Sequence, residues 1–155
     1  MPINRDFIGR AYPGTTTYEV SREVIRRFAE AIGDDNPLCL DAAAARAAGH
    51  ADVVAPPTFL IATNGRYGAG SPVEDPAFGV DYSRVVHGEQ RFTLHRPVVA
   101  GDVLLSTSRV VEVRDIGTNE LAAIEQEITD EAGRPVATLW SSLVSRGTAA
   151  PRMTA

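Results

Sequence analysis

The stretch VLLSTSRVVEVR, residues 103–114, is rich in β-branched residues and is typical of an extended strand. Three further segments of this kind lie at residues 82–96, 121–129 and 136–144. Clusters of turn-forming residues separate them, at residues 101–102, 117–119 and 130–133. The spacing predicts four consecutive antiparallel strands joined by hairpins.

Helical patterns precede these strands. Apolar residues between Ser21 and Gly33 recur at spacings of three and four, which predicts an amphipathic helix with Ser21 as its N-cap and Gly33 as its end. The alanine-rich residues 41–48 predict a second short helix. Residues 55–58 contain two prolines and form a rigid entry, and residues 59–62 after them are almost wholly apolar, so a helix buried in the core is predicted over residues 57–66.

The other segments before residue 82 have no helical period. Residues 15–20 are β-branched and aromatic and predict a short strand, whereas residues 68–79 hold glycines, prolines and acids and predict an exposed loop. This order of elements predicts an α+β class, with one curved antiparallel sheet wrapped around one long buried helix. At 155 residues, the chain has the length of a single domain spanning residues 1–155.

Charge and composition exclude several kinds of partner. The chain has 20 acidic and 15 basic residues, and the basic ones are scattered, so nucleic acid is not expected. No stretch approaches the ~20 apolar residues of a membrane span, and a soluble, cytoplasmic protein is expected. Cys39 is the only cysteine and lies too far from the histidines for a metal-ligand spacing. Neither a disulfide nor a metal is therefore expected, and no organic cofactor is implied.

Strand alternation places Gln90 on the apolar face of the segment 82–96, together with Phe92. A buried amide without a partner costs about 1–3 kcal/mol, so Gln90 is expected to bind the buried helix or a substrate thioester. The same alternation places His87 and His95 on the opposite face. That face is expected to be solvated, with docking of a carrier protein as the alternative.

Residues 33–41, GDDNPLCLD, resemble the Gly-Asp-X-Asn-Pro-Leu-His-X-Asp signature of MaoC-like (R)-specific enoyl hydratases and (3R)-hydroxyacyl dehydratases. Residues 90–102 resemble the phenylalanine, proline-valine and glycine-aspartate pattern of the same family. The resemblance implies a hot-dog fold that acts on acyl thioesters of acyl-carrier protein (ACP) or CoA. It also implies an obligate dimer, with the active site and an acyl tunnel at the interface, which suits the open edges of a sheet.

Three shorter stretches resemble a subgroup of this family, the substrate-binding subunits of mycolic-acid-type dehydratases. They are residues 18–20, 50–59 and 81–90. The resemblance to the subgroup implies that the partner in the dimer is a different, catalytic hot-dog subunit.

The family resemblance assigns catalytic positions to Asp34 and Asn36, but Cys39 stands where the family has its histidine. A neutral thiol is a poor substitute for an imidazole in moving protons at neutral pH. Pro56 and Pro57 stand where the family has a histidine and a glycine whose N–H binds the thioester oxygen, and proline has no N–H. The remaining candidates for binding that oxygen are the amides of Thr58 and Phe59 at the helix N-terminus, besides Gln90.

Each of these residues also has a purely structural interpretation. Asp34 and Asn36 are turn formers that accept hydrogen bonds from nearby backbone amides, and Cys39 is expected to be a small buried apolar residue. The large apolar residues suit an acyl tunnel but are expected mainly to fill the core. They are Phe59, Leu60, Ile61, Phe92, Leu94, Leu139 and Trp140.

Three functions fit this sequence. The first is a subunit that binds the acyl chain of a (3R)-hydroxyacyl thioester while a partner supplies the Asp/His pair for dehydration or hydration. The second is a self-sufficient homodimeric hydratase or dehydratase that uses Asp34 alone or with a histidine from elsewhere in the chain. The third is a non-enzymatic binder of acyl thioesters, which would retain the tunnel without turnover.

Overall fold

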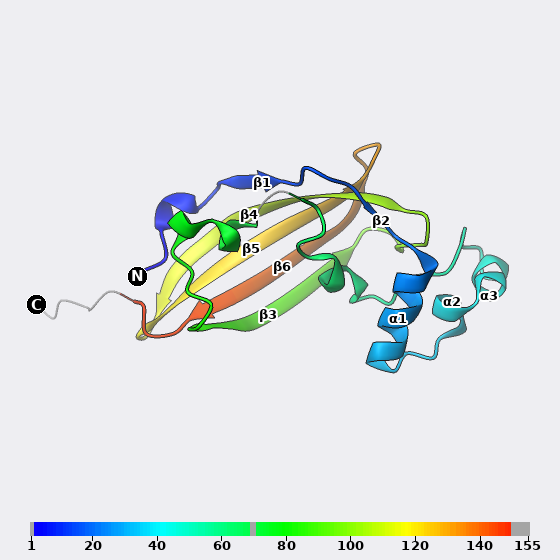
Figure 1. The fold of residues 1–155 in the computed structure, drawn as a ribbon, viewed down its shortest axis with the longest axis horizontal. Coiled ribbons are helices and arrows are strands. Elements are labelled where there is room, and N and C mark those ends of the chain that lie inside the picture. The colour runs from blue at the N-terminus through cyan, green and yellow to red at the C-terminus, as the bar shows by residue number, and fades with distance from the viewer. Residues whose placement is uncertain (1, 69–70, 150–155) are drawn as a thin grey trace, which may run out of the picture.

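The computed structural model describes residues 2–68 and 71–149. Its centre is one antiparallel sheet in the order β1-β4-β5-β6-β3, with β2 also paired to β4 (Figure 1). Three short α-helices lie at one end of the sheet, and the segment before β1 and the end of β6 lie toward the other end. The strands are β1 Ala11–Pro13, β2 Tyr18–Glu19, β3 Val85–Leu94, β4 Val103–Ile116, β5 Asn119–Asp130 and β6 Pro135–Ser145.

The four long strands confirm the strand prediction, but their order differs from a simple meander. Hairpins join β4 to β5 and β5 to β6, whereas β3 pairs with β6 instead of with β4. The prediction of a hairpin between β3 and β4 is therefore wrong. β3 and β4 form no hairpin because residues 95–102 leave the sheet between them. Val99 forms a bridge with Val54, and the Gly101 amide donates to the Val20 carbonyl.

The helix after Ser21 is confirmed as α1, Arg22–Ile32. The Ser21 hydroxyl accepts a hydrogen bond from the Val24 amide, and Gly33 ends the helix in the left-handed conformation at φ 71°. The alanine-rich stretch forms α3, Ala42–Ala47, which Asp41 caps. Between them, the turn-forming sequence adds a four-residue helix, α2 Pro37–Leu40, with Asn36 as its cap.

The strand expected over residues 15–20 is shorter than the pattern predicted. Only Tyr18 and Glu19 pair with β4, while β1 forms earlier in the chain. Residues 15 and 16 instead donate their amides to the Tyr67 carbonyl.

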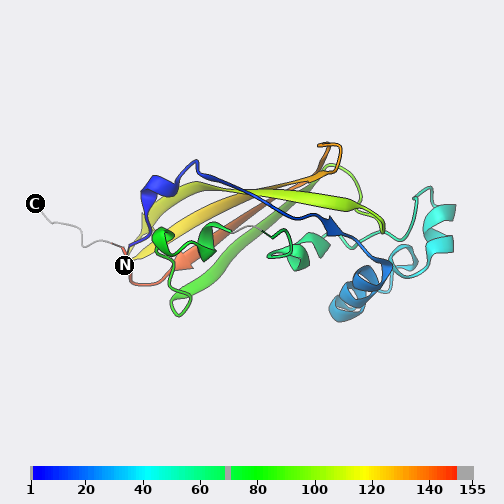
Figure 2. The ribbon, with the colours of Figure 1, turned by 45° about the horizontal axis from the view of Figure 1, so that its top comes forward.

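The long buried helix expected over residues 57–66 is not present. Its place is taken by a short 3-10 helix, η2 Phe59–Thr63. The Thr63 hydroxyl donates to the Leu60 carbonyl, and Gly65 and Gly68 follow with φ of 75° and 81°. A helix cannot continue through such left-handed glycines. The chain instead crosses one face of the sheet in separate turns, and α1 to α3 lie beyond the end of the sheet (Figures 1 and 2).

The segment 68–79 was predicted as an exposed loop, and this is wrong for the part that the structure describes. It contains two 3-10 turns, η3 Pro72–Glu74 and η4 Pro76–Phe78. The Phe78 side chain is fully buried, and its ring lies 5.3 Å from that of Phe7, in η1 Arg5–Phe7. The turns are therefore anchored to the N-terminal segment by apolar packing.

Two apolar clusters stabilise the fold at opposite ends of the sheet. The first joins α1 and η2 to the strands through residues such as Ile25, Phe59 and Leu104. The second joins the N-terminal segment to β4 and β5 through Phe7, Phe78 and Val110 among others. No helix in the described parts of the chain is long and apolar enough to cross a membrane.

Candidate functional site

The residues singled out from the sequence lie at two separate cavities. The helix-end cavity, of about 430 Å³, lies between the α1–α2 connection, the Pro56-Pro57 pair and the residues that follow β3. The sheet cavity, of about 360 Å³, lies between the face of the sheet and the segment after η2. Asp34, Asn36 and Cys39 line the first, whereas Gln90 lines the second.

Asp34 and Asn36 each hold a local turn. The Asp34 Oδ1 accepts a hydrogen bond from the Asn36 amide at 3.0 Å, and the Asn36 Oδ1 accepts one from the Leu38 amide at 3.0 Å. This is the geometry that the structural interpretation predicted. Both residues nevertheless face the helix-end cavity, so the turn role and a role toward a ligand are compatible.

Cys39 lies in α2 and is 4% exposed. Burial raises the pKa of its thiol above the ordinary value, and the negative charge of Asp34 raises it further. The thiol is therefore protonated at neutral pH and is neither an activated nucleophile nor a proton shuttle. Cys39 also packs in the first apolar cluster, which agrees with its prediction as a small buried residue.

Pro56 and Pro57 form another wall of the helix-end cavity. The Phe59 amide donates to the Pro56 carbonyl at 2.9 Å, so it is not available to a ligand oxygen. The Phe59 ring is 1% exposed and packs edge-on against Phe28, with ring centroids 5.6 Å apart. Thr58 is exposed and caps η2 without a side-chain hydrogen bond. Of the two amides proposed from the sequence, only that of Thr58 remains a candidate.

His95 also lines the helix-end cavity, which the sequence pattern did not indicate. It follows the last residue of β3, where strand alternation no longer sets the direction of a side chain. Its Nε2 lies 3.0 Å from the Thr138 hydroxyl, and its amide donates to the Val136 carbonyl. The cavity therefore contains an imidazole, although it comes from a different element than the family motif predicts.

The neighbouring wall of this cavity is fixed by an ion pair. Arg96 donates two hydrogen bonds to the Asp102 carboxylate, at 2.7 and 3.0 Å, and the pKa of Arg96 is raised chiefly by that contact. Asp102 also accepts the Val99 amide at 2.9 Å. The glycine-aspartate pattern of the sequence thus holds the loop between β3 and β4.

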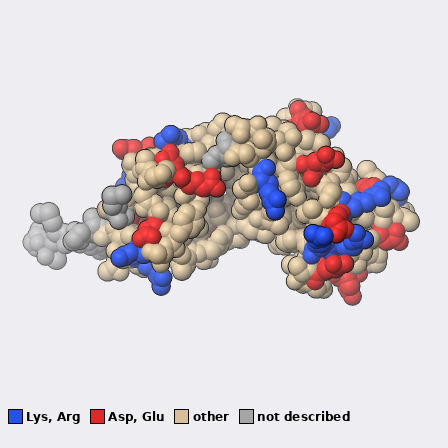
Figure 3. Space-filling view, in the orientation of Figure 1, with Lys and Arg blue, Asp and Glu red and all other residues tan. Residues whose placement is uncertain are grey.

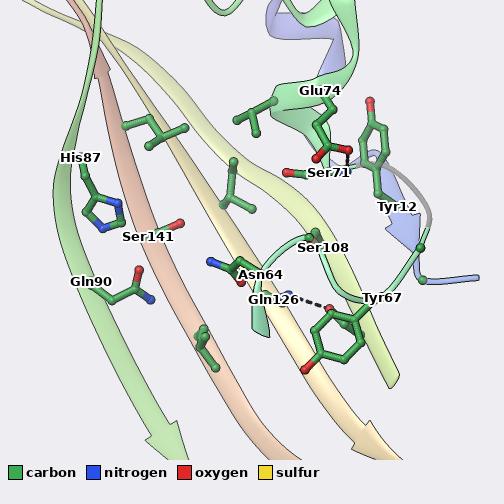
Figure 4. Close-up of a pocket in the computed structure, with 18 of the residues that line it drawn as sticks. Tyr12, Asn64, Tyr67, Ser71, Glu74, His87, Gln90, Ser108, Gln126 and Ser141 are labelled. Atoms are coloured by element: carbon green, nitrogen blue, oxygen red, sulfur yellow. Dashed lines mark hydrogen bonds between the residues drawn. The ribbon is translucent and has the colours of Figure 1, made fainter. Parts of the chain in front are cut away.

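Gln90 projects from β3 into the sheet cavity, where Asn64, His87 and Ser141 also lie (Figure 4). Its Nε2 reaches the Arg91 carbonyl only at 3.5 Å, and its Oε1 is buried without a hydrogen-bond partner in the described parts of the chain. The prediction that Gln90 lies on the apolar face of its strand is confirmed, since this is the inner face of the sheet, toward the sheet cavity. The expected hydrogen bond from Gln90 to the backbone of a buried helix is not formed among the described residues, where only the short η2 occupies that segment.

His87 was predicted on the outer face, and this is wrong. A β-bulge shifts the pairing of β3 with β6 between His87 and Glu89, so His87 and Gln90 face the same side of the sheet. The cause is Gly88: a Cβ atom there would lie 2.7 Å from the Ser142 hydroxyl, which accepts the Glu89 amide. The Gly88 in the strand was the signal for a bulge.

The residues considered for an acyl tunnel divide between the core and the two cavities. Leu60 and Leu94 line the helix-end cavity, and Leu139 lines the sheet cavity. The Trp140 ring instead lies against the Arg91 guanidinium, 4.4 Å from its centre. Within the described residues, no group of His, Cys, Asp and Glu is arranged to hold a metal ion.

Comparison with known proteins identifies the family. The model of the FAS1-like dehydratase domain region matches residues 6–139. A UPF0336 protein of Parafrankia sp. (strain EAN1pec) is 57% identical over 98% of this chain and 100% of its own length. A UPF0336 protein of Streptomyces coelicolor is 50% identical over 94% of this chain and 97% of its own.

Solved structures agree with this assignment. A MaoC-like dehydratase is 34% identical with a TM-score of 0.78 over 90% of this chain, which spans 42% of that protein. The HadBC complex, a (3R)-hydroxyacyl-ACP dehydratase of Mycobacterium tuberculosis, is 27% identical with a TM-score of 0.79, covering 90% of this chain and 98% of that one. The UPF0336 proteins are relatives over at least 94% of this chain, and the chain therefore belongs to the MaoC-like hot-dog dehydratase family.

Proposed function

We propose that this chain is the acyl-binding subunit of a two-subunit (3R)-hydroxyacyl-thioester dehydratase or enoyl hydratase. Its partner would be a catalytic hot-dog subunit with an intact Asp/His pair, and its substrate an acyl-ACP or acyl-CoA in the cytoplasm. The assignment of this chain to the substrate-binding subgroup of the family is part of the same proposal. The similarity to the HadBC complex, whose name describes a hydroxyacyl-ACP dehydratase, supports it.

The observation that carries the proposal is the environment of Cys39. Dehydration requires a base for the proton beside the thioester carbonyl, an acid for the leaving hydroxyl and donors for the carbonyl oxygen. A buried thiol with a raised pKa supplies neither base nor acid at neutral pH. The Phe59 amide is already bonded to Pro56 and supplies no donor. The acid–base function that the family assigns to its histidine is therefore not supplied by Cys39, and in this proposal it comes from another chain.

Reconstitution tests the proposal. The chain is purified alone and after co-expression with a small MaoC-like protein that has the complete Asp-X-Asn-Pro-X-His sequence, and dehydration of 3-hydroxyacyl thioesters is measured for both. We expect turnover only in the complex. In the complex, Asp34→Asn in this chain should leave kcat nearly unchanged, whereas a substitution of the partner's aspartate should abolish turnover. Turnover by this chain alone would contradict the proposal.

One observation favours a second candidate, a self-sufficient hydratase. His95 lines the same cavity as Asp34, so an imidazole and a carboxylate share one site without the family histidine. This candidate predicts that the purified chain hydrates crotonyl-CoA, and that Asp34→Asn and His95→Ala each abolish the activity. The matched control is Asp35→Asn, because Asp35 is exposed and does not line this cavity.

A further inference from the structure

The inner face of the sheet changes from apolar to polar and back again along its length. On β4, Leu104 belongs to the first apolar cluster and Val110 to the second. Between them, Ser106 and Ser108 face the sheet cavity. An ordinary protein core has apolar residues at such positions, because buried hydroxyl groups must find partners.

The polar residues of neighbouring strands lie in register with one another. Ser108 pairs with Gln126 of β5, and Ser141 of β6 pairs with Gln90 of β3. We call this set the polar band. Its members, all lining the sheet cavity, are His87, Gln90, Ser106, Ser108, Gln126 and Ser141.

Only part of the polar band is satisfied by the protein itself. The Gln126 Nε2 donates to the Ser106 hydroxyl at 2.8 Å. By contrast, the Gln90 Oε1 is buried without a partner in the parts of the chain that the structure describes. A buried amide oxygen is costly to leave unpaired, so this position is suited to a ligand group that donates a hydrogen bond.

The lining of the cavity also limits what that ligand can be. The band consists of hydroxyl, amide and imidazole groups, while Ile124, Leu139 and Leu143 supply apolar surface beside it. The carboxylate in the lining, Glu74, accepts the Ser71 amide. A lining without arginine or lysine among the described residues does not favour a phosphate or carboxylate. A neutral chain with hydrogen-bonding groups matches it.

From these observations we infer that the sheet cavity selects acyl chains that carry a hydroxyl group beyond the reacting 3-position. The inference rests on the proposed function, since it names the substrate class of the same protein. A hydroxyl group donates to the Gln90 Oε1 and accepts from the Gln90 Nε2 or the Ser141 hydroxyl. A plain alkyl chain leaves these groups unpaired and therefore binds more weakly. The volume of about 360 Å³ lies within the range of small-ligand pockets, about 300–1,000 Å³.

Binding of defined thioesters to the full-length chain tests the inference. The probes are decanoyl-CoA, hydroxydecanoyl-CoA isomers with the hydroxyl in the middle of the chain, and CoA without an acyl group, and calorimetry gives each Kd. We expect at least one hydroxylated isomer to bind about tenfold more tightly than decanoyl-CoA, which is the effect of one well-placed hydrogen bond.

Gln90→Met tests the residue, because methionine has a similar length and no hydrogen-bonding amide. The Kd values of the plain and the hydroxylated thioester should then be about equal. Retained binding of decanoyl-CoA shows that the variant is folded. Ser141→Ala, on the neighbouring strand, should reduce the preference in part. Arg91→Met is the matched control: Arg91 lies between Gln90 and Phe92 but on the opposite face of β3, against Trp140, and its replacement should leave the preference unchanged.

Three results would overturn the inference. Equal binding of hydroxylated and plain chains to the native protein is the first, and a preference that persists in both Gln90→Met and Ser141→Ala is the second. The third is binding of CoA alone that depends on Gln90, which would place the amides of the pantetheine arm in the cavity instead. A failure to bind any thioester would instead overturn the proposed function itself.

Discussion

Cys39 and Asp34 show how strongly single positions depend on their neighbours. The same nine-residue stretch that resembles the family signature places the carboxylate and the thiol on one cavity wall. Because Asp34 is negatively charged, it raises the pKa of the Cys39 thiol and makes its deprotonation less favourable. In a motif with histidine at this position, the same charge would stabilise a protonated imidazole. The charge raises the pKa in both cases, but a protonated imidazole can donate a proton near neutral pH, whereas a protonated thiol with a raised pKa is unreactive.

This coupling predicts how Cys39 reacts with iodoacetamide. Alkylation requires the thiolate, so its rate rises with pH around the pKa of the thiol. Asp34→Asn removes a charge that raises this pKa and keeps an oxygen for the Asn36 amide. We therefore expect the pH-rate profile to move to lower pH, with faster alkylation at neutral pH. Asp35→Asn is the control and should leave the profile in place; identical profiles for all three proteins would refute the electrostatic coupling.

Among the elements, β3 has the most direct consequences for the sheet cavity. The bulge after His87 is what brings His87 to the same face as Gln90. Gly88 permits the close approach of β3 to Ser142, whose hydroxyl accepts the Glu89 amide at 3.0 Å. A regular strand at this point would turn His87 away from the cavity.

Gly88→Ala should therefore destabilise the protein, because its Cβ atom would lie 2.7 Å from the hydroxyl of Ser142, a residue that is buried. We expect a loss of about 1–3 kcal/mol in the free energy of unfolding, measured by urea denaturation. In a Ser142→Ala background the additional cost of Gly88→Ala should be smaller, since the clashing oxygen is gone. Equal costs in both backgrounds would show that the contact is not the cause.

At the scale of the whole molecule, the helical end and the sheet differ in their surfaces. Charged side chains of both signs gather over the helical end, while uncharged residues cover much of the middle of the same face (Figure 3). The sheet ends at β3, which has a paired strand on one side only within the described chain. Val86 on this edge is 44% exposed. An open edge with exposed apolar residues is a ready surface for a second chain.

Val86→Lys should weaken association at this edge, because a lysine on an edge strand opposes pairing with another strand. We expect the dissociation constant of the dimer, homomeric or with the catalytic subunit, to rise at least tenfold in sedimentation experiments. The matched control is Val111→Lys on β4, where the valine is 37% exposed but β5 and β6 separate the strand from the β3 edge. Both variants should keep their stability within about 0.5 kcal/mol of the native protein. If Val111→Lys weakened association equally, the β3 edge would not be the interface.

Much of this protein was predictable from the sequence alone, because the information was local. The caps of α1, the turn at Asp34 and Asn36, and the four long strands follow from spacing and from side chains that bond their own backbone. The resemblance of residues 33–41 led to the correct family, and the burial of Cys39 followed from its residue type.

Only the tertiary structure decided which of these elements meet. The pairing of β3 with β6, the replacement of a long helix by η2, and the bulge that turns His87 inward all depend on contacts distant in sequence. The division of the predicted residues between two cavities has the same origin. A periodic pattern specifies which face of an element is apolar, but not what that face packs against. For that reason the sequence determined the family and the missing histidine, while the structure determined the polar band and the position of His95 beside Asp34.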